Sequence, residues 1–167
     1  MKRQYAWSAV IIIVVSAIVF SVTYRTNRLP EIPVPSDPRA QTGLSVVPVV
    51  LPDGTRIAAE VARTPRQLAI GLMFRDSVPP LTGLLMVYNE HGYRSIWMKN
   101  VRVDLDIVFI GENKRITNIV KHLKSPSDGM SDDEIPRAVG HGKYVLELAA
   151  GEADRLGLEK GMQLSFL

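Results

Sequence analysis

Five charged side chains lie within or next to apolar segments of the sequence, where a charge needs a partner or a function. They are Arg75, Lys99, Asp104, Asp106 and Glu147. Asp104 and Asp106 are two residues apart, so both carboxylates would lie on one face of a strand. If the five groups converge on one cleft, they would bind a small polar ligand or support acid–base chemistry. The alternative, which we favour, is an ion-pair network that closes the sheet.

Two further residues complete the candidate set. On a strand, Trp97 would share a side with Lys99, and Asn100 would lie on the opposite side. Trp97 belongs either to a binding surface or to the core. The predicted ligand-binding or partner-binding residues are therefore Arg75, Trp97, Lys99, Asn100, Asp104, Asp106 and Glu147.

The sequence predicts no catalytic residue, metal site or cofactor. It contains no cysteine, which excludes a thiolate metal site and a thiol nucleophile. His91, His122 and His141 are far apart along the chain and no pair has the spacing of metal ligands. The run 132–134 is acidic but lacks the calcium-loop pattern, and residues 140–143 lack the full phosphate-loop motif.

The net charge of +3 is confined to the N-terminal arm. Residues 1–45 carry five basic and two acidic side chains, whereas residues 46–167 carry fifteen of each. A neutral body removes the main reason to expect nucleic acid as a partner.

The arm has the features of a membrane anchor. From Tyr5 to Tyr24 no residue is charged, and a helix of this length spans roughly 30 Å, the thickness of a bilayer's hydrocarbon core. Tyr5, Trp7 and Tyr24 would lie at the two interfaces, with Arg25 among the headgroups. We expect residues 1–24 to form a single transmembrane signal-anchor helix. A cleaved secretory signal is the alternative.

The residues that flank the anchor bear on its orientation, and those that follow it predict a spacer. Basic residues flank the segment on both sides almost equally, so we take the usual arrangement for an N-terminal anchor. The predicted location is the bacterial cytoplasmic membrane, with the body on the periplasmic side. Residues 25–45 contain four closely spaced prolines and are predicted to be an extended linker, either a passive stalk or a strip that docks on a partner.

Residues 46–167 are expected to form one globular domain of the α+β class. Thr64, Pro65 and Gln67 predict a helix start with a capping box, and this is the one main helix. The rest predicts a curved antiparallel sheet or a partly closed β-barrel. The strands are expected at 45–51, 55–63, 84–88, 94–98, 104–110, 115–123, 143–149 and 162–166, with a long polar loop at 124–142 and a helical turn at 151–158.

Four sequence blocks, in this order, resemble the domain-of-unknown-function 192 family (DUF192), a group of small prokaryotic proteins. They are Gly71-Leu72-Met73-x-Arg75, Trp97-Met98-Lys99-Asn100, Asp104-Leu105-Asp106-Ile107-Val108-Phe109 and Val145-Leu146-Glu147-Leu148-x-x-Gly151. The chain departs from the family pattern in three places. It has Gly83-Leu84-Leu85-Met86 where Gly-Met-Leu-Phe is usual, Asn100-Val101 where Asn-Thr is usual, and Gly161-Met162 where an acidic residue usually follows the glycine. Without the threonine hydroxyl beside Asn100, a polar site there is weakened. The resemblance implies a fold and a location, and no reaction.

Two functions remain open at this point. The first is a membrane-anchored, non-catalytic module on the outer side of the membrane that binds a protein partner, such as an accessory subunit of a respiratory or photosynthetic complex. The second is a small-ligand-binding or hydrolytic periplasmic enzyme that uses the charged cluster. A concave pocket containing those side chains would favour the second.

Overall fold

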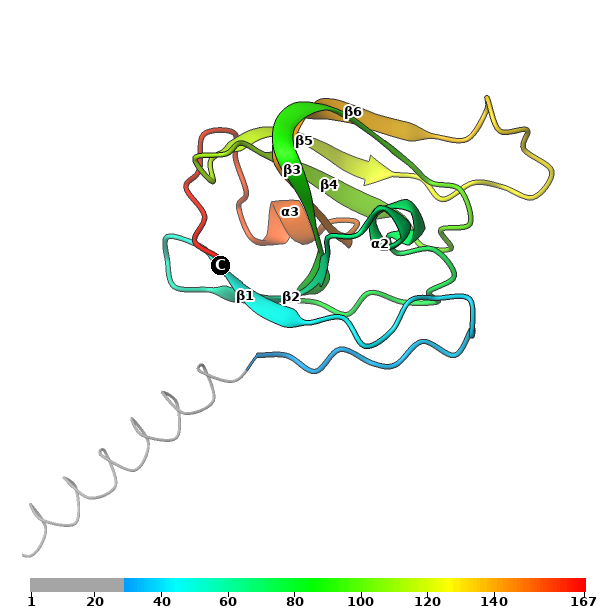
Figure 1. The fold of residues 1–167 in the computed structure, drawn as a ribbon, viewed down its shortest axis with the longest axis horizontal. Coiled ribbons are helices and arrows are strands. Elements are labelled where there is room, and N and C mark those ends of the chain that lie inside the picture. The colour runs from blue at the N-terminus through cyan, green and yellow to red at the C-terminus, as the bar shows by residue number, and fades with distance from the viewer. Residues whose placement is uncertain (1–28) are drawn as a thin grey trace, which may run out of the picture.

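One mixed β-sheet organises the protein in the computed structural model, which describes residues 29–167 (Figure 1). Its six strands follow the order β1-β2-β3-β6-β4-β5. The strands are β1 (Val46–Val50), β2 (Arg56–Ala62), β3 (Thr82–Trp97), β4 (Leu105–Ile110), β5 (Ile116–Leu123) and β6 (Arg137–Ala149). The two helices of this part of the chain are short: α2 (Pro65–Ile70) and α3 (Glu152–Arg155).

The expected fold class, an antiparallel sheet or partial barrel with one main helix, is wrong. β2 and β3 pair in parallel, so the sheet is mixed, and neither described helix is long enough to be a main helix. The reason lies between residues 62 and 82, where the chain crosses back through α2 before it enters β3. A parallel connection needs a crossover of this length, whereas a tight turn would have made an antiparallel pair.

The predicted transmembrane helix was part of the same expectation, and its residues 1–24 lie outside the described residues. Within residues 29–167, no helix is long and apolar enough to cross a membrane.

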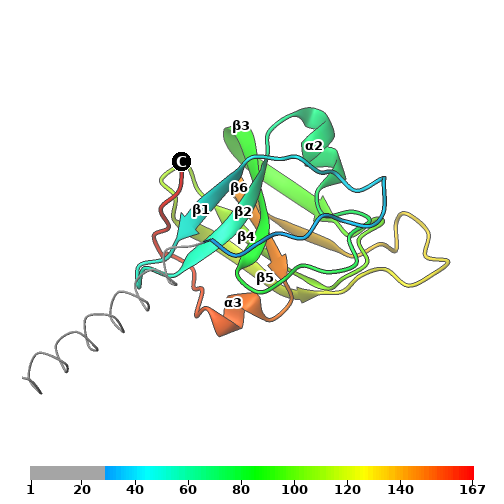
Figure 2. The same ribbon diagram turned by 90° about the horizontal axis from the view of Figure 1, so that it is seen from below.

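The sheet is buried on both faces, and each face has its own core. Neighbouring residues of a strand alternate between the two cores, as Leu84 and Leu85 do in β3. One core contains Leu72 and Met73 of the turn after α2, and the other contains Ala153 of α3. Figure 2 shows the two helices on opposite sides of the sheet. We call these sides the α2 face and the α3 face.

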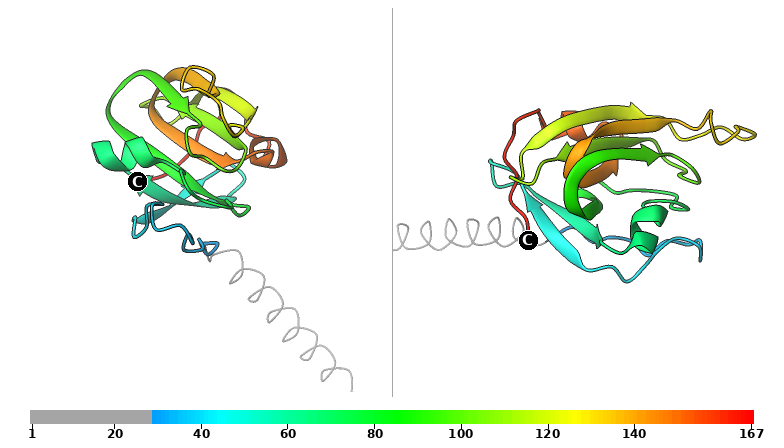
Figure 3. Two further views of the ribbon diagram at one scale, coloured as in Figure 1. Left: turned by 90° about the vertical axis from the view of Figure 1, so that its right-hand side faces the viewer. Right: turned by 45° about the horizontal axis from the view of Figure 1, so that its top comes forward.

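β3 and β6 are longer than the sequence pattern suggested. The two strands expected at 84–88 and 94–98 are one strand whose register with β6 shifts between Val87 and Gly92. β6 begins at Arg137, inside the expected polar loop, and the two strands form a bent antiparallel ribbon (Figure 3). The expected strand at 162–166 makes only isolated bridges, Val50 to Ser165 and Arg115 to Gln163.

The N-terminal segment 29–44 lies along the body and does not project from it (Figures 1 and 2). Gln41 is buried and its side-chain amide donates to the carbonyl oxygens of Gln67 and Gly71, at 3.2 and 2.7 Å. The described part of the predicted linker is therefore packed against the domain.

Ion pairs hold the same segment from outside. Arg102 forms salt bridges with Asp37 and with Asp76, and the hydroxyl of Ser36 donates to Asp76 at 2.8 Å. The neighbouring Arg39 holds the pKa of the Asp37 carboxyl well below its usual range by hydrogen bonding. These exposed contacts connect residues far apart in sequence and fix the path of the segment.

Candidate functional site

Two buried carboxylates lie in one row across the sheet. Glu60 of β2 is in register with Leu84 of β3, and Leu84 is in register with Glu147 of β6. Residues in register on neighbouring strands share a face, so both acidic side chains lie on the α2 face with Leu84. Glu60 and Glu147 are only 6% and 3% exposed, and buried charges at this level require compensation.

The turn after α2 brings a cation to this row. The capping box of Thr64 and Gln67 starts α2 as predicted, and the helix ends at Gly71, whose φ of 53° favours glycine. The turn then carries Arg75 into the interior, where it is 5% exposed. Arg75 forms an ion pair with Glu60 and donates to the carbonyl oxygen of Gln41 at 3.0 Å.

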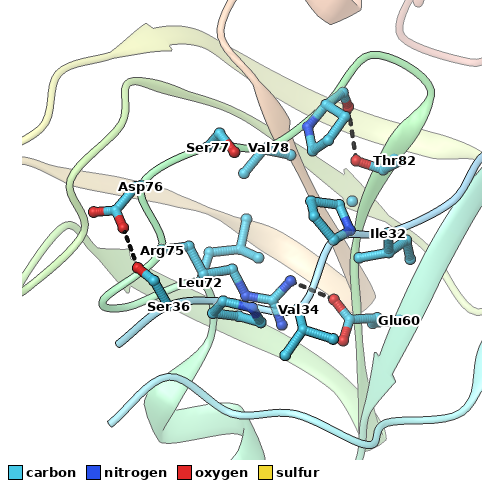
Figure 4. A pocket seen from close by; sticks show the side chains of 14 residues that line it. Ile32, Val34, Ser36, Glu60, Leu72, Arg75, Asp76, Ser77, Val78 and Thr82 are labelled. Atoms are coloured by element: carbon cyan, nitrogen blue, oxygen red, sulfur yellow. Dashed lines mark hydrogen bonds and ion pairs between the residues drawn. The ribbon is translucent and has the colours of Figure 1, made fainter. Parts of the chain in front are cut away.

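A cavity surrounds this ion pair, and we call it the Arg75 cavity (Figure 4). It has a volume of about 180 Å³. Residues 32–36 of the N-terminal segment line one side, while Glu60, Leu72 and Arg75 line the other. Its wall is thus supplied by a segment whose position depends on the contacts of Arg102 and Gln41.

A second cavity, of about 160 Å³, borders Leu72 as well, and we call it the Glu147 cavity. Its lining is mainly apolar and aromatic, with Glu147 as the single carboxyl among the lining residues. The lining includes Leu68, Ile70, Met73, Met86, Tyr88, Ile96, Trp97 and Val101. Ser95 is exposed and also lines the cavity, so the space reaches the surface.

Burial dominates the electrostatics of Glu147. Desolvation raises the pKa of its carboxyl to about 7, against the opposing effects of the Arg75 charge and a hydrogen bond from the backbone N–H of Leu72. Its Oε2 atom is buried and has no hydrogen-bond partner. A Cβ at Gly71 would lie 3.4 Å from that oxygen, so glycine lets the backbone pass close to the carboxyl. The arrangement leaves one buried acidic oxygen without a hydrogen-bond donor among the described residues.

The structure places Asp104 and Asp106 away from both cavities. Asp106 is buried and accepts hydrogen bonds from the backbone N–H groups of His122, Gly151 and Ala153, at 2.8–2.9 Å. Asp104 pairs with Lys124, which lowers the pKa of the aspartate carboxyl. These carboxylates hold the end of β5 and the start of α3.

Trp97 lines the Glu147 cavity, whereas Lys99 and Asn100 line a separate, more open cavity beside residues 125–132. The Nζ of Lys99 lies 5.0 Å from the centre of the Trp97 ring. Lys99 also pairs with Asp132 at 2.7 Å. Asn100 has a left-handed backbone, φ 57°, and its carbonyl oxygen accepts from the N–H of Phe74 at 2.8 Å. The seven predicted residues therefore do not converge on one cleft.

Two residues of the site are absent from the sequence prediction. Glu60 is a single charge within the apolar run of β2, and that isolation was a usable signal. Tyr88 lines the Glu147 cavity, and burial raises the pKa of its phenol. Nothing in the local pattern distinguishes it from a core tyrosine. Among residues 29–167, no group of three His, Asp or Glu side chains is arranged to hold a metal ion.

The domain is thus a mixed β-sheet with two acidic residues, Glu60 and Glu147, buried beneath the turn after α2. Residues 49–166 match the DUF192 family, described as "Uncharacterized ACR". The match covers most of the chain, and the protein belongs to this family. No curated protein matches the chain.

Two crystal structures are similar to this chain. One is a "putative transcription regulator" from Sinorhizobium meliloti, 28% identical, with a TM-score of 0.65, covering 75% of this chain and 97% of its own. The other is a protein of unknown function from Novosphingobium aromaticivorans, 29% identical, with a TM-score of 0.61, covering 81% of this chain and 93% of its own. Both similarities extend over nearly the whole of the other protein.

Proposed function

We propose that the chain is a non-catalytic module that binds a protein partner through one face of the β3–β6 ribbon. We define this outer ribbon face by six residues that are directly opposite one another in register: Tyr93 and His141, Ser95 and Val139, Trp97 and Arg137. Their neighbours Ile96 and Ala138 are buried in the core of the α2 face, and Trp97 is half-buried against the edge of the same core.

The observation that supports this proposal is the exposure of large side chains on the outer ribbon face. Tyr93 is 60% exposed and Val139 is 46% exposed. Tyrosine, tryptophan and arginine are the residue types that contribute most to binding at protein interfaces. Their side chains already contact one another: Tyr93 packs edge-on against His141 at 5.6 Å, and Arg137 lies 5.0 Å from the Trp97 ring. A surface ordered in this way loses less conformational entropy on binding.

The location of the module is the second part of the proposal. The 20 uncharged residues from Tyr5 to Tyr24 support attachment to a membrane, with the domain on the extracytoplasmic side. If the partner lies in the same membrane, this chain would be an accessory subunit of a larger membrane complex. Protease treatment of intact spheroplasts tests the side: we expect the domain to be degraded, and its protection would contradict an extracytoplasmic location.

Co-purification tests the partner. We expect the tagged full chain, extracted from native membranes in a mild detergent, to bring down one protein in near-stoichiometric amount. The double variant Tyr93→Ser/Val139→Ser should lose most of that protein, because single interface anchors contribute about 2 kcal/mol or more. Val46→Ser is the matched control, since Val46 is 45% exposed but lies in β1, outside the outer ribbon face.

Two results would contradict the proposal. The first is a wild-type chain that emerges alone under these conditions. The second is a partner that the double variant and the Val46→Ser control retain equally well.

A further inference from the structure

We propose that the Glu147 cavity is a binding site for a primary alkylammonium group, a cation carried on a short apolar chain. This inference goes beyond partner binding at the outer ribbon face. It rests on three observations: the size and lining of the cavity, the unpartnered Oε2 of the buried Glu147 carboxyl, and the pairing of the nearby Arg75 with Glu60 rather than with Glu147.

The size and lining of the cavity suit a short aliphatic chain. Its volume of about 160 Å³ corresponds to about five non-hydrogen atoms, taking roughly 30 Å³ for each, as for liquid water. Met73, Met86 and Ile96 supply apolar walls. Methionine side chains adapt to irregular aliphatic shapes. The lining therefore favours an apolar body over a sugar or a nucleobase.

The carboxyl of Glu147 supplies the polar end of the site. Its Oε2 lacks a hydrogen-bond partner, and the residue is only 3% exposed. A buried acceptor left without a donor is costly. An ammonium group provides both the missing donor and the missing countercharge. An anion would be repelled by the ionised carboxylate. A neutral hydroxyl would leave the buried charge uncompensated.

The charged groups around Glu147 do not already fill this role. Arg75 pairs with Glu60 and lines the other cavity, with Leu72 bordering both. From β3, Tyr88 faces Glu147 with a raised phenol pKa, and Arg94 stacks on the Tyr88 ring at 4.0 Å. Arg94 donates instead to the carbonyl oxygens of Gly142 and Glu90. No cation among the described residues forms a salt bridge with Glu147.

Thermal unfolding of the full chain in mild detergent tests the site, with n-butylamine as the probe. We expect 10 mM n-butylamine at pH 8 to raise Tm, because a ligand that binds only the folded state stabilises it by mass action. Butan-1-ol and butyrate at the same concentration should give a clearly smaller shift. Glu147→Gln should abolish the amine-specific part. Glu112→Gln should retain it, since Glu112 is exposed and pairs with Lys143.

Binding by the unmodified protein provides a test that does not depend on a variant folding. Since the free carboxyl has a pKa of about 7, the dissociation constant for n-butylamine should be about tenfold weaker at pH 6 than at pH 8. Calorimetry in two buffers at pH 7 should show proton release on binding. A dissociation constant that does not change with pH would overturn the inference.

A third arm identifies the source of the ammonium group. Binding of both n-butylamine and Nα-acetyl-lysine amide would indicate a lysine side chain of a partner, whereas binding of n-butylamine alone would indicate a free amine. Both results support an alkylammonium site. Equal Tm shifts with butan-1-ol and n-butylamine, an undiminished shift in Glu147→Gln, or no shift with the amine would each overturn it. The Tyr93→Ser/Val139→Ser test can fail independently of these results, because neither Tyr93 nor Val139 lines the Glu147 cavity.

Discussion

At the scale of single residues, Glu147 and Arg75 show two ways in which this protein holds a buried charge. Arg75 is compensated by Glu60 and by the carbonyl oxygen of Gln41. Glu147 has no comparable partner, and its carboxyl responds by a rise in pKa to about 7. A buried ion pair contributes little net stability, but losing one member is costly because the other charge stays buried. Glu147 is therefore the residue whose protonation should be visible in the stability of the fold.

The first prediction concerns that protonation. The carboxyl has a pKa near 4.5 in the unfolded chain and about 7 in the folded one, so the folded state binds more protons between these values. Protonation of Glu147 therefore contributes most to stability below pH 4.5, and this contribution is lost as the pH rises through 7. The free energy of unfolding falls by about 3 kcal/mol over this range. Glu147→Gln should remove most of this fall, measured by urea denaturation at pH 5 and pH 8.

Glu112→Gln is the control for this measurement. Pairing with Lys143 lowers the pKa of the Glu112 carboxyl, so its titration affects stability only at more acidic pH. The wild-type and Glu112→Gln proteins should lose similar stability between pH 5 and pH 8. An equal loss in Glu147→Gln would show that another group is responsible.

At the scale of elements, the β3–β6 ribbon depends on close contact between β6 and the interior of the sheet. A Cβ on Gly140 would lie 2.6 Å from ring atoms of Phe109, a buried residue of β4. The ring lies directly against the backbone of β6. Glycine at this position is therefore needed for packing between strands, and the outer ribbon face depends on the same contact.

The second prediction follows from this contact. Gly140→Ala should lower the free energy of unfolding by about 1–3 kcal/mol, because the added methyl group overpacks the core. Gly92→Ala is the matched control in the same ribbon, since the nearest atoms, 3.6 Å away, belong to the flexible Arg94 side chain. Chemical denaturation measures both. Adding Phe109→Leu to Gly140→Ala should cost less than the sum of the single changes. Strict additivity would contradict the proposed clash.

The sequence predicted elements best where the signal is local. The capping box of Thr64 and Gln67 is confirmed, because it depends on residues three positions apart. The parallel pairing of β2 and β3 was missed, since a crossover and a hairpin begin with the same strand pattern. In the site, Arg75 and Glu147 were predicted from their apolar surroundings. Asp106 was predicted as a site residue by the same argument, but its carboxylate accepts hydrogen bonds from backbone N–H groups distant in sequence and has a structural role.

At the scale of the whole molecule, the N-terminal segment 29–44 is a structural part of the domain. It supplies a wall of the Arg75 cavity and an acceptor for Arg75. Arg102 forms a salt bridge with Asp37 of the segment and another with Asp76, which accepts from Ser36 of the segment. The residues of the segment were predicted to belong to a linker, because four closely spaced prolines disfavour helix and sheet. Their packing arises from long-range contacts that composition does not encode.

The third prediction tests this attachment. Arg102→Ala should accelerate proteolytic cleavage within residues 29–39 by up to about fivefold, the effect expected from exposed ion pairs of about 0.2–1 kcal/mol. Arg66→Ala, a change at an exposed arginine of α2, should leave the rate unchanged. Limited proteolysis followed by mass spectrometry identifies the cleavage sites. Equal cleavage rates in the two variants would show that Arg102 does not hold the segment.

The strand order also sets when the domain can assemble. β6 is the last strand of the chain, yet it lies between β3 and β4 in the sheet. Until it is synthesised, β1–β3 and β4–β5 are two separate pieces, each with an unpaired edge. The chain must therefore be free to fold as far as residue 149 before the sheet can close, and folding that waits for distant contacts is slow. Nascent chains that stop short of this point should remain dependent on chaperones.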